Sequence, residues 1–291
     1  MLPSEIPSAL AVAVDAARQA GAIIRQRFPA SANDPRLGIR NKGRINLVTE
    51  VDLACEQLIR RVILERFPDH RVLGEEEGAG PNEDRATEPL WIVDPLDGTA
   101  GFAHGYPFVG VSIGLEVSAS MVLGVVYDPL HDELFEAQRG QGARLNGASI
   151  KVSATPNLEQ ALIVSGFPYQ LGDFDNEAFF GLFRELVCQS GGFRRDGAAA
   201  LDFCYVACGR TDAFWEFFLA PWDSAAGSLI LTEAGGVITD LGGGPFDLRR
   251  PEMLASNGIL HPSIIELARP YLPGIRPHLP REAPWSVDPG P

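Results

Sequence analysis

The chain has 291 residues, of which 45% are hydrophobic and 21% charged, a composition typical of a soluble globular protein with room for two closely packed subdomains. Its formal net charge of −14 argues against a nucleic-acid partner, because phosphates require a basic surface. An anionic substrate would also be repelled, unless bound divalent cations supplied the missing positive charge.

Membrane insertion and zinc binding are not expected. No stretch approaches the roughly 20 apolar residues that span a bilayer, and no basic segment precedes the apolar part of the N-terminal residues. We therefore expect a cytoplasmic protein with reduced cysteines. Cys204 and Cys208 lie in an apolar run and are interpreted as buried side chains, because no Cys or His cluster completes a zinc site.

Two amphipathic helices are predicted in the first part of the chain. Residues 8–28 place apolar side chains on one helical face, where Gly21 indicates either close packing or a weak point. A second helix follows Thr49, and its broad apolar face consists of Cys55, Leu58, Ile59, Val62 and Ile63. The polar, glycine-containing segment 31–46 between the two helices indicates a loop.

A run of strands follows. Residues 109–117 alternate apolar side chains with Gly, Ser and Glu, SAS predicts a turn, and MVLGVVYD predicts the returning strand. ELFEA and RGQGARLNG continue as a strand and a hairpin. The first half is therefore expected to be two helices against a largely antiparallel sheet.

The second half alternates helices and strands. Strands are predicted in ALIVSG, DAFWEFF and VITD, and helices in 176–189, GAAALDFCYVACG and PWDSAAGSLILTEAGG, which indicates an α/β arrangement with helices on both faces of a sheet. The tail from Pro273 has six prolines in 19 residues and is expected to be extended or disordered. The predicted division is 1–154, 155–272 and a Pro-rich tail, 273–291.

Acidic residues concentrate in three segments. In LWIVDPLDGTAGF (90–102) an apolar strand is expected to stop at Asp94, and a proline-stiffened turn then brings Asp97. LGEEEG contains Glu75, and APWDSAAGS places Asp223 at the start of a helix. Each segment alone also has a plainer interpretation: a turn, a solvated charge run or a helix cap.

Together the three segments indicate a magnesium site. Mg²⁺ prefers oxygen ligands, and such carboxylates could hold two or more ions about 3.5–4 Å apart, an arrangement suited to phosphoryl transfer. The Leu96 carbonyl is a further neutral ligand, and Gly98 and Thr99 offer N–H and hydroxyl groups to a phosphate oxygen. Covalent catalysis of the haloacid-dehalogenase type is disfavoured, because Pro95 stands where the nucleophile would precede Asp97.

With these segments in place, the sequence resembles the inositol monophosphatase family in order over residues 40–260. The motifs that carry the resemblance are NLVTEVD, GEE, WIVDPLDGTAGF, GVVYDP, RRDGAAALDFCYVACGRTDAFWE and PWDSAAGSLILTEAGGVITDLGGGPFDL. WIVDPLDGT and PWDSAAGSLILTEAGG are the most specific. The resemblance implies a layered αβαβα sandwich of the inositol monophosphatase/fructose-1,6-bisphosphatase type, α+β in the first half and α/β in the second, with a homodimer, Mg²⁺ dependence and Li⁺ inhibition.

The resemblance also implies a set of metal ligands: Glu75, Asp94, the Leu96 carbonyl, Asp97 and Asp223. It implies that the phosphate lies against Gly98 and Thr99. Thr99 and Glu75 would position and deprotonate the attacking water, and Asp52 would act through the Thr99 hydroxyl.

Further implied contacts concern the alcohol part of the substrate. Glu216, Asp97 and the backbone near Ala199 would bind it, and a water near Asp223 would protonate the leaving alkoxide. Lys42 matches the loop lysine of the family only approximately. Other departures from the family pattern are Asn46, Gly101 and Ala198.

The expected function is that of a phosphoric monoester hydrolase of the inositol-phosphate phosphatase type. It would hydrolyse myo-inositol 1-phosphate or a similar small polyol or sugar phosphate with a metal-activated water, using about two or three Mg²⁺ ions per site, with Mn²⁺ as a substitute. One alternative is the same chemistry on fructose 1,6-bisphosphate, histidinol phosphate, a 3′-phosphoadenosine phosphate or NADP. Another is a regulatory protein-binding role, whose sequence sign would be a lost metal ligand, and none is lost.

Overall fold

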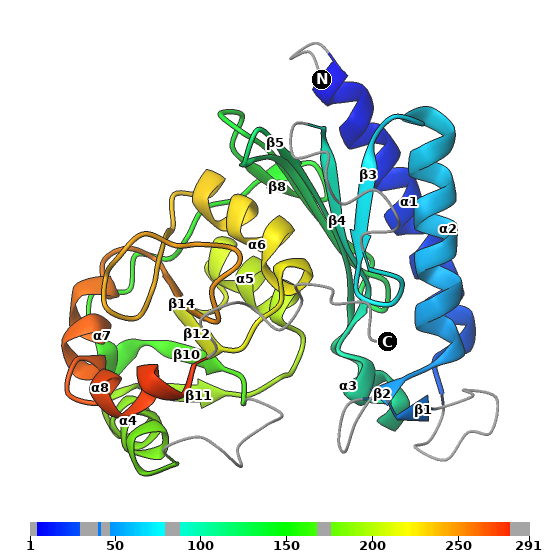
Figure 1. The fold of residues 1–291 in the computed structure, drawn as a ribbon. Coiled ribbons are helices and arrows are strands. Elements are labelled where there is room, and N and C mark those ends of the chain that lie inside the picture. The colour runs from blue at the N-terminus through cyan, green and yellow to red at the C-terminus, as the bar shows by residue number, and fades with distance from the viewer. Residues whose placement is uncertain (1–4, 30–39, 42–46, 79–87, 168–175, 280–291) are drawn as a thin grey trace.

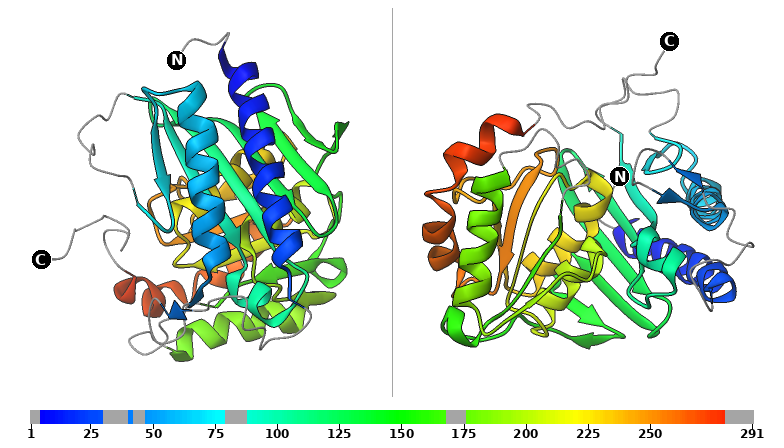
Figure 2. Two further views of the ribbon diagram at one scale, coloured as in Figure 1. Left: turned by 90° about the vertical axis from the view of Figure 1, so that its right-hand side faces the viewer. Right: turned by 90° about the horizontal axis from the view of Figure 1, so that it is seen from below.

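The computed structural model describes residues 5–29, 40–41, 47–78, 88–167 and 176–279. Five layers follow one another: a helix pair, a seven-stranded sheet, a second helix pair, a five-stranded sheet and an outer group of helices (Figures 1 and 2). This arrangement confirms the expected αβαβα sandwich. Among the described residues, no helix is both long and apolar enough to cross a membrane.

The first layer consists of α1 (Ile6–Arg27) and α2 (Glu50–Arg66), both close to their predicted positions. Gly21 of α1 marks close packing, because a Cβ there would lie 2.5 Å from the ring of Tyr127. Helix α2 is capped by Thr49, whose side chain accepts the Val51 N–H, while the Asp52 carboxylate accepts the Thr49 N–H at 2.8 Å. The short strands β1 (Arg40–Asn41) and β2 (Leu47–Val48) pair before it.

The larger sheet has the order β3-β4-β5-β6-β7-β8-β9. Its strands are β3 (Arg71–Gly74), β4 (Leu90–Asp97), β5 (Gly110–Val117), β6 (Ser120–Asp128), β7 (Glu133–Gln138), β8 (Ala143–Leu145) and β9 (Ala148–Ser149). Only the β3–β4 pair is parallel. The prediction of two helices against a largely antiparallel sheet is confirmed.

Both faces of β5 are buried, because α6 (Pro221–Glu233) covers the face on which Gly and Ser alternate. A Cβ on Gly124 of β6 would lie 2.6 Å from the Ala226 carbonyl oxygen, and a Cβ on Gly114 would lie 3.1 Å from Ala225 Cβ. The small residues of the alternating pattern therefore admit a helix at backbone distance.

The smaller sheet has the order β11-β10-β12-β14-β13. Its strands are β10 (Leu162–Ser165), β11 (Gly192–Arg194), β12 (Ala213–Phe217), β13 (Val237–Thr239) and β14 (Glu252–Ser256), of which β11 and β14 were not predicted. Helices α5 (Ala199–Ala207) and α6 lie between the two sheets. On the outer face lie α4 (Asn176–Gln189), α7 (His261–Ala268) and α8 (Leu272–Ile275) (Figure 1). Helices on both faces were expected, and the division at residue 154 stays a prediction.

The prediction of an extended tail from Pro273 is wrong for its first residues. Pro273 lies in the first turn of α8, and Pro277 lies in the short 3₁₀ helix Arg276–His278. Proline fits there because the first N–H groups of a helix have no partner within the helix. Residues 280–291 lie outside the described part of the chain.

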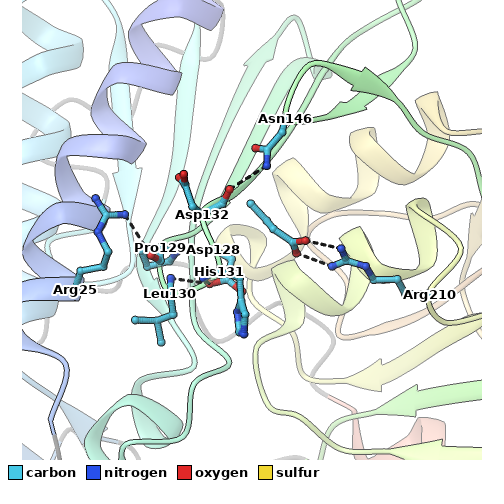
Figure 3. Close-up of polar contacts among 9 residues, drawn as sticks. Arg25, Asp128, Pro129, Leu130, His131, Asp132, Asn146 and Arg210 are labelled. Carbon is cyan, nitrogen blue, oxygen red and sulfur yellow. Dashed lines mark hydrogen bonds and ion pairs between the residues drawn. The ribbon is translucent and has the colours of Figure 1, made fainter.

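The β6–β7 turn joins separate layers (Figure 3). Arg25 of α1 donates to the Pro129 carbonyl oxygen at 3.2 Å, and Arg210, which follows α5, makes two hydrogen bonds to the Glu133 carboxylate. Asp128 is fully buried and accepts backbone N–H groups of the turn. The turn therefore holds α1 and the chain after α5 to the same end of the sheet.

Candidate active site

Strand β4 does not stop at Asp94, as the sequence suggested, but continues through Asp97. It pairs with β5 through Asp94↔Ser112 and Asp97↔Gly110, so β4 has one residue more than its partner between these two pairs. Side chains three positions apart normally face opposite sides of a strand, and the extra residue returns Asp97 to the side of Asp94. The segment is thus a bulged strand instead of a turn, and a bulge is one of the few places where a sheet accepts a proline such as Pro95.

Beside Asp94 lies the acidic turn, which we define as residues 74–78. The backbone closes it between Gly74 and Gly78, with N···O distances of 3.2 and 3.1 Å. The Glu75 N–H donates to the Val93 carbonyl oxygen at 3.3 Å. Glu75 is therefore fixed next to the residue that precedes Asp94.

Thr99 begins the short helix α3 (Thr99–His104) directly after Gly98, whose φ of 89° and lack of a Cβ allow the tight passage from strand to helix. The Thr99 hydroxyl lies 2.8 Å from Asp52 Oδ1 and 2.9 Å from the Leu96 carbonyl oxygen. Asp52 is 1% exposed, and burial raises its pKa. The contact between Asp52 and Thr99 is the one that the family resemblance implied, while its catalytic role stays a prediction.

Asp223 lies in the first turn of α6. Its Oδ2 accepts the Ala220 N–H at 2.6 Å, so it does cap the helix. Its charge also raises the pKa of both Asp94 and Asp97. The Asp223 carboxylate therefore caps its helix and at the same time acts electrostatically on Asp94 and Asp97.

The second half of the chain closes the site through α5 and β12. Asp97 Oδ2 accepts the Ala200 N–H at 2.7 Å, one residue after the predicted contact residue Ala199. Glu216 of β12 lies against Gly166, where a Cβ would come within 1.8 Å of its carboxylate. Residues from both halves thus meet around Asp97.

The electrostatic setting is dominated by acidic side chains that act on Asp94 and Asp97. Burial and the charges of Glu75, Asp97 and Asp223 raise the pKa of Asp94 well above 3.8. Burial, Asp223, Glu75 and Glu216 do the same to Asp97. Among the described residues, none of the main influences on either pKa is a cationic side chain. The ionised cluster is therefore unfavourable by itself and calls for a cation.

These donors fit a hard divalent cation by their chemistry, since all are oxygens. In the described part of the chain, no three His, Cys, Asp or Glu side chains already stand in a finished ligand arrangement. The metal assignment consequently rests on the donor type and on the raised pKa values of Asp94 and Asp97, and it stays a prediction. Lys42 and Asn46 lie outside the described residues.

Sequence reasoning missed two acidic residues beside the site. Asp202 of α5 is 2% exposed, its Oδ1 has no hydrogen-bond partner among the described residues, and burial and Glu216 raise its pKa. It is the only acid in GAAALDFCYVACG, a signal that the sequence did contain. Glu56 of α2 is fully buried beneath the acidic turn, but in the sequence it looks like half of a surface pair with Arg60.

Comparisons with known proteins agree with this geometry. A sequence model described as the inositol monophosphatase family matches residues 7–272. Nus factor SuhB of Pseudomonas aeruginosa is 41% identical over 265 residues, covering 91% of this chain and 97% of its own. Inositol monophosphatase 2 of Solanum lycopersicum is 45% identical over 257 residues, covering 87% and 95%. The crystal structure of the extragenic suppressor protein suhB from Bartonella henselae superposes with a TM-score of 0.83 at 37% identity, covering 90% and 98%.

Proposed function

Because this chain belongs to the inositol monophosphatase family, whose members are phosphoric monoester hydrolases, we propose that it hydrolyses myo-inositol 1-phosphate or a similar small polyol phosphate in a Mg²⁺-dependent reaction. The observation that carries the proposal is the acidic cluster around the buried Asp94 and Asp97, whose pKa values are raised by burial and by the charges of Glu75 and Asp223. A cation bound among these oxygens would favour the ionised form of Asp94 and Asp97.

The proposed roles are those that the resemblance to the family implies. The metal would be held by Glu75, Asp94, the Leu96 carbonyl, Asp97 and Asp223. When bound, Mg²⁺ would supply positive charge that polarises the phosphate and lowers the pKa of water. Gly98 and Thr99 would hold the phosphate oxygens through their N–H groups, next to the Thr99 hydroxyl.

The remaining groups would orient the reactants. Glu75 and the Thr99 hydroxyl would position the attacking water and take its proton, and Asp52, 2.8 Å from that hydroxyl, would fix its direction. Glu216, Asp97 and the Ala199 backbone would contact the alcohol. A water beside Asp223 would return a proton to the leaving oxygen.

The direct test is phosphate release from inositol 1-phosphate with and without Mg²⁺, for the wild type and for Asp94→Asn. We expect a loss of at least about 100-fold in the variant, as for removal of a metal-holding group. Asp128→Asn is the matched control, because Asp128 is also a buried acid at a strand end of the same sheet. Full activity of Asp94→Asn would refute the metal assignment. A comparison of kcat/KM over the alternative substrates named above would identify the preferred ester.

A second candidate function is binding to a protein of the transcription machinery. It is supported by the similarity to a relative named Nus factor SuhB, and the net charge of −14 favours a protein over a nucleic acid as the partner. Binding of purified transcription factors to Asp94→Asn, in an assay independent of phosphatase turnover, would separate the two roles. A homodimer, a cytoplasmic location and inhibition by Li⁺ remain part of the proposal, and sedimentation and activity assays check the first and the last.

A further inference from the structure

The acidic turn is held from below by a carboxylate of α2. Glu56 is 0% exposed; its Oε2 accepts the Glu76 N–H at 2.8 Å, and its Oε1 accepts the Glu77 N–H at 3.0 Å. Two successive N–H groups of the turn therefore point at one side chain. The approach requires Gly74, because a Cβ there would lie 2.2 Å from Glu56 Oε1.

Arg60, one helical turn further along α2, holds both the carboxylate and the ends of the turn. Its Nε donates to Glu56 Oε1 at 2.9 Å, and its guanidinium also donates to the carbonyl oxygens of Val72 and Gly78. The Arg60 side chain is 14% exposed and that of Glu56 is 0% exposed. Removing both charges from water costs free energy that offsets much of their attraction, so a buried ion pair often adds little to stability. The arrangement of Glu56 and Arg60 under the turn therefore needs another explanation.

That explanation lies in what the turn carries. Glu75 precedes the two residues whose N–H groups Glu56 accepts, and its own N–H binds Val93, the neighbour of Asp94. Between β4 on one side and Glu56 on the other, the backbone of the acidic turn has little freedom to move. The position from which the Glu75 side chain reaches toward Asp94 is thereby set by α2.

We propose that Glu56, braced by Arg60, is a positioning residue that holds Glu75 in place and so sets the affinity for the divalent ion. The inference rests on the proposed function of Glu75 as a metal-holding residue. Groups that orient ligands without touching the metal typically change affinity by about 10–100-fold when they are removed.

The test compares Glu56→Gln with wild type in the full chain. Gln keeps the volume but replaces one acceptor oxygen by an NH₂ group, so one of the two turn N–H groups loses its partner. We expect the Kd for Mn²⁺, measured by calorimetry on metal-free protein, to rise about tenfold or more. The half-saturating Mg²⁺ concentration for phosphate release should rise by the same factor while kcat at saturation changes less, and amide exchange at Glu76 and Glu77 should accelerate.

The matched control is Glu233→Gln. Glu233 also accepts two backbone N–H groups of one turn, those of Gly140 and Gly142, at 2.8 Å each, and that turn carries no residue of the site. Its loss should lower stability without changing the Kd for Mn²⁺. A purely structural role of Glu56 predicts the same pattern for both variants, and that result would overturn the proposal.

A second variant covers the case in which Glu56→Gln does not fold. In Arg60→Lys the charge remains, but a single ammonium cannot reach three acceptors, so the Kd for Mn²⁺ should rise in the same direction by a smaller factor. An unchanged Kd in folded Arg60→Lys also overturns the proposal. If the wild type binds Mn²⁺ but releases no phosphate, the proposed function fails, and the ion-binding comparison still decides the role of Glu56.

Discussion

Replacing Glu216 by Gln should stabilise the metal-free protein, and increasingly so as the pH rises. Burial and the charge of Asp223 raise the pKa of Glu216 from 4.5 to about 8. Below the pKa of the unfolded chain, Glu216 is protonated in both the folded and the unfolded protein, and it does not make the stability depend on pH. Between the two pKa values the unfolded chain releases a proton that the folded chain retains, so the stability of the wild type falls with pH until the folded pKa is passed.

The size of the effect follows from the same two values. At about 1.36 kcal/mol per pH unit, a rise from 4.5 to about 8 corresponds to about 5 kcal/mol as an upper limit. Glu216 keeps partial contact with solvent, which weakens its repulsion by Asp223. We therefore expect the free-energy difference at pH 8 to be about half of this upper limit.

The assay is urea unfolding in EDTA at pH 5, 6, 7 and 8 for wild type and Glu216→Gln. The difference in unfolding free energy should be near zero at pH 5 and favour the variant by about 2 kcal/mol at pH 8. Glu159→Gln, an exposed carboxylate on the second half of the chain, corrects for the change in net charge. A difference that does not vary with pH, or a wild type that is the more stable protein at pH 8, would refute the reasoning.

Three further outcomes are expected. Gly124→Ala should lower the unfolding free energy by about 1–3 kcal/mol, since its Cβ would lie 2.6 Å from the Ala226 carbonyl oxygen. Gly110→Ala should cost less in the same urea experiment, because the atom nearest to its Cβ would belong to the flexible Leu201 side chain, at 3.3 Å. Burial lowers the pKa of His261 below 6.5 in the folded protein. The stability that the neutral imidazole contributes is therefore fully present above pH 6.5 and is lost as the pH falls toward the folded pKa. Between pH 7 and 5 the unfolding free energy of His261→Gln should consequently fall less than that of the wild type. Mg²⁺ should raise the thermal midpoint more at pH 8 than at pH 5.5, because protons compete for the same carboxylates; equal shifts would contradict this.

The sequence predicted those parts of the fold that local pattern determines. Helix α4 is observed at its predicted residues, 176–189, because its apolar periodicity is strong and uninterrupted. Strand β14 was missed although it has a neighbouring strand on each side in its sheet, since five residues after a charged, proline-containing segment give no clear strand signal. The resemblance to a family supplied the order of the layers, which periodicity alone does not contain.

Tertiary contacts explain the remaining differences. Pro95 favours a turn locally, yet pairing with β5 on both sides of it keeps the segment in the sheet as a bulge. Ser112 lies on the side of its strand opposite the alternating apolar residues, yet it is fully buried and donates to the Trp222 carbonyl oxygen at the start of α6. Glu56 could not be distinguished in the sequence from an ordinary exposed pair with Arg60, because its partners in the acidic turn lie about 20 residues away along the chain.

Helix α6 rests on the larger sheet with main chain against main chain at Gly124, where an added Cβ would lie 2.6 Å from the Ala226 carbonyl oxygen and 3.0 Å from Ala226 Cα. The distance between the sheet and the first turn of α6, which carries Asp223, is therefore set in part by two backbones in contact. One added methyl group at Gly124 would press directly on the Ala226 backbone and shift the helix that positions Asp223.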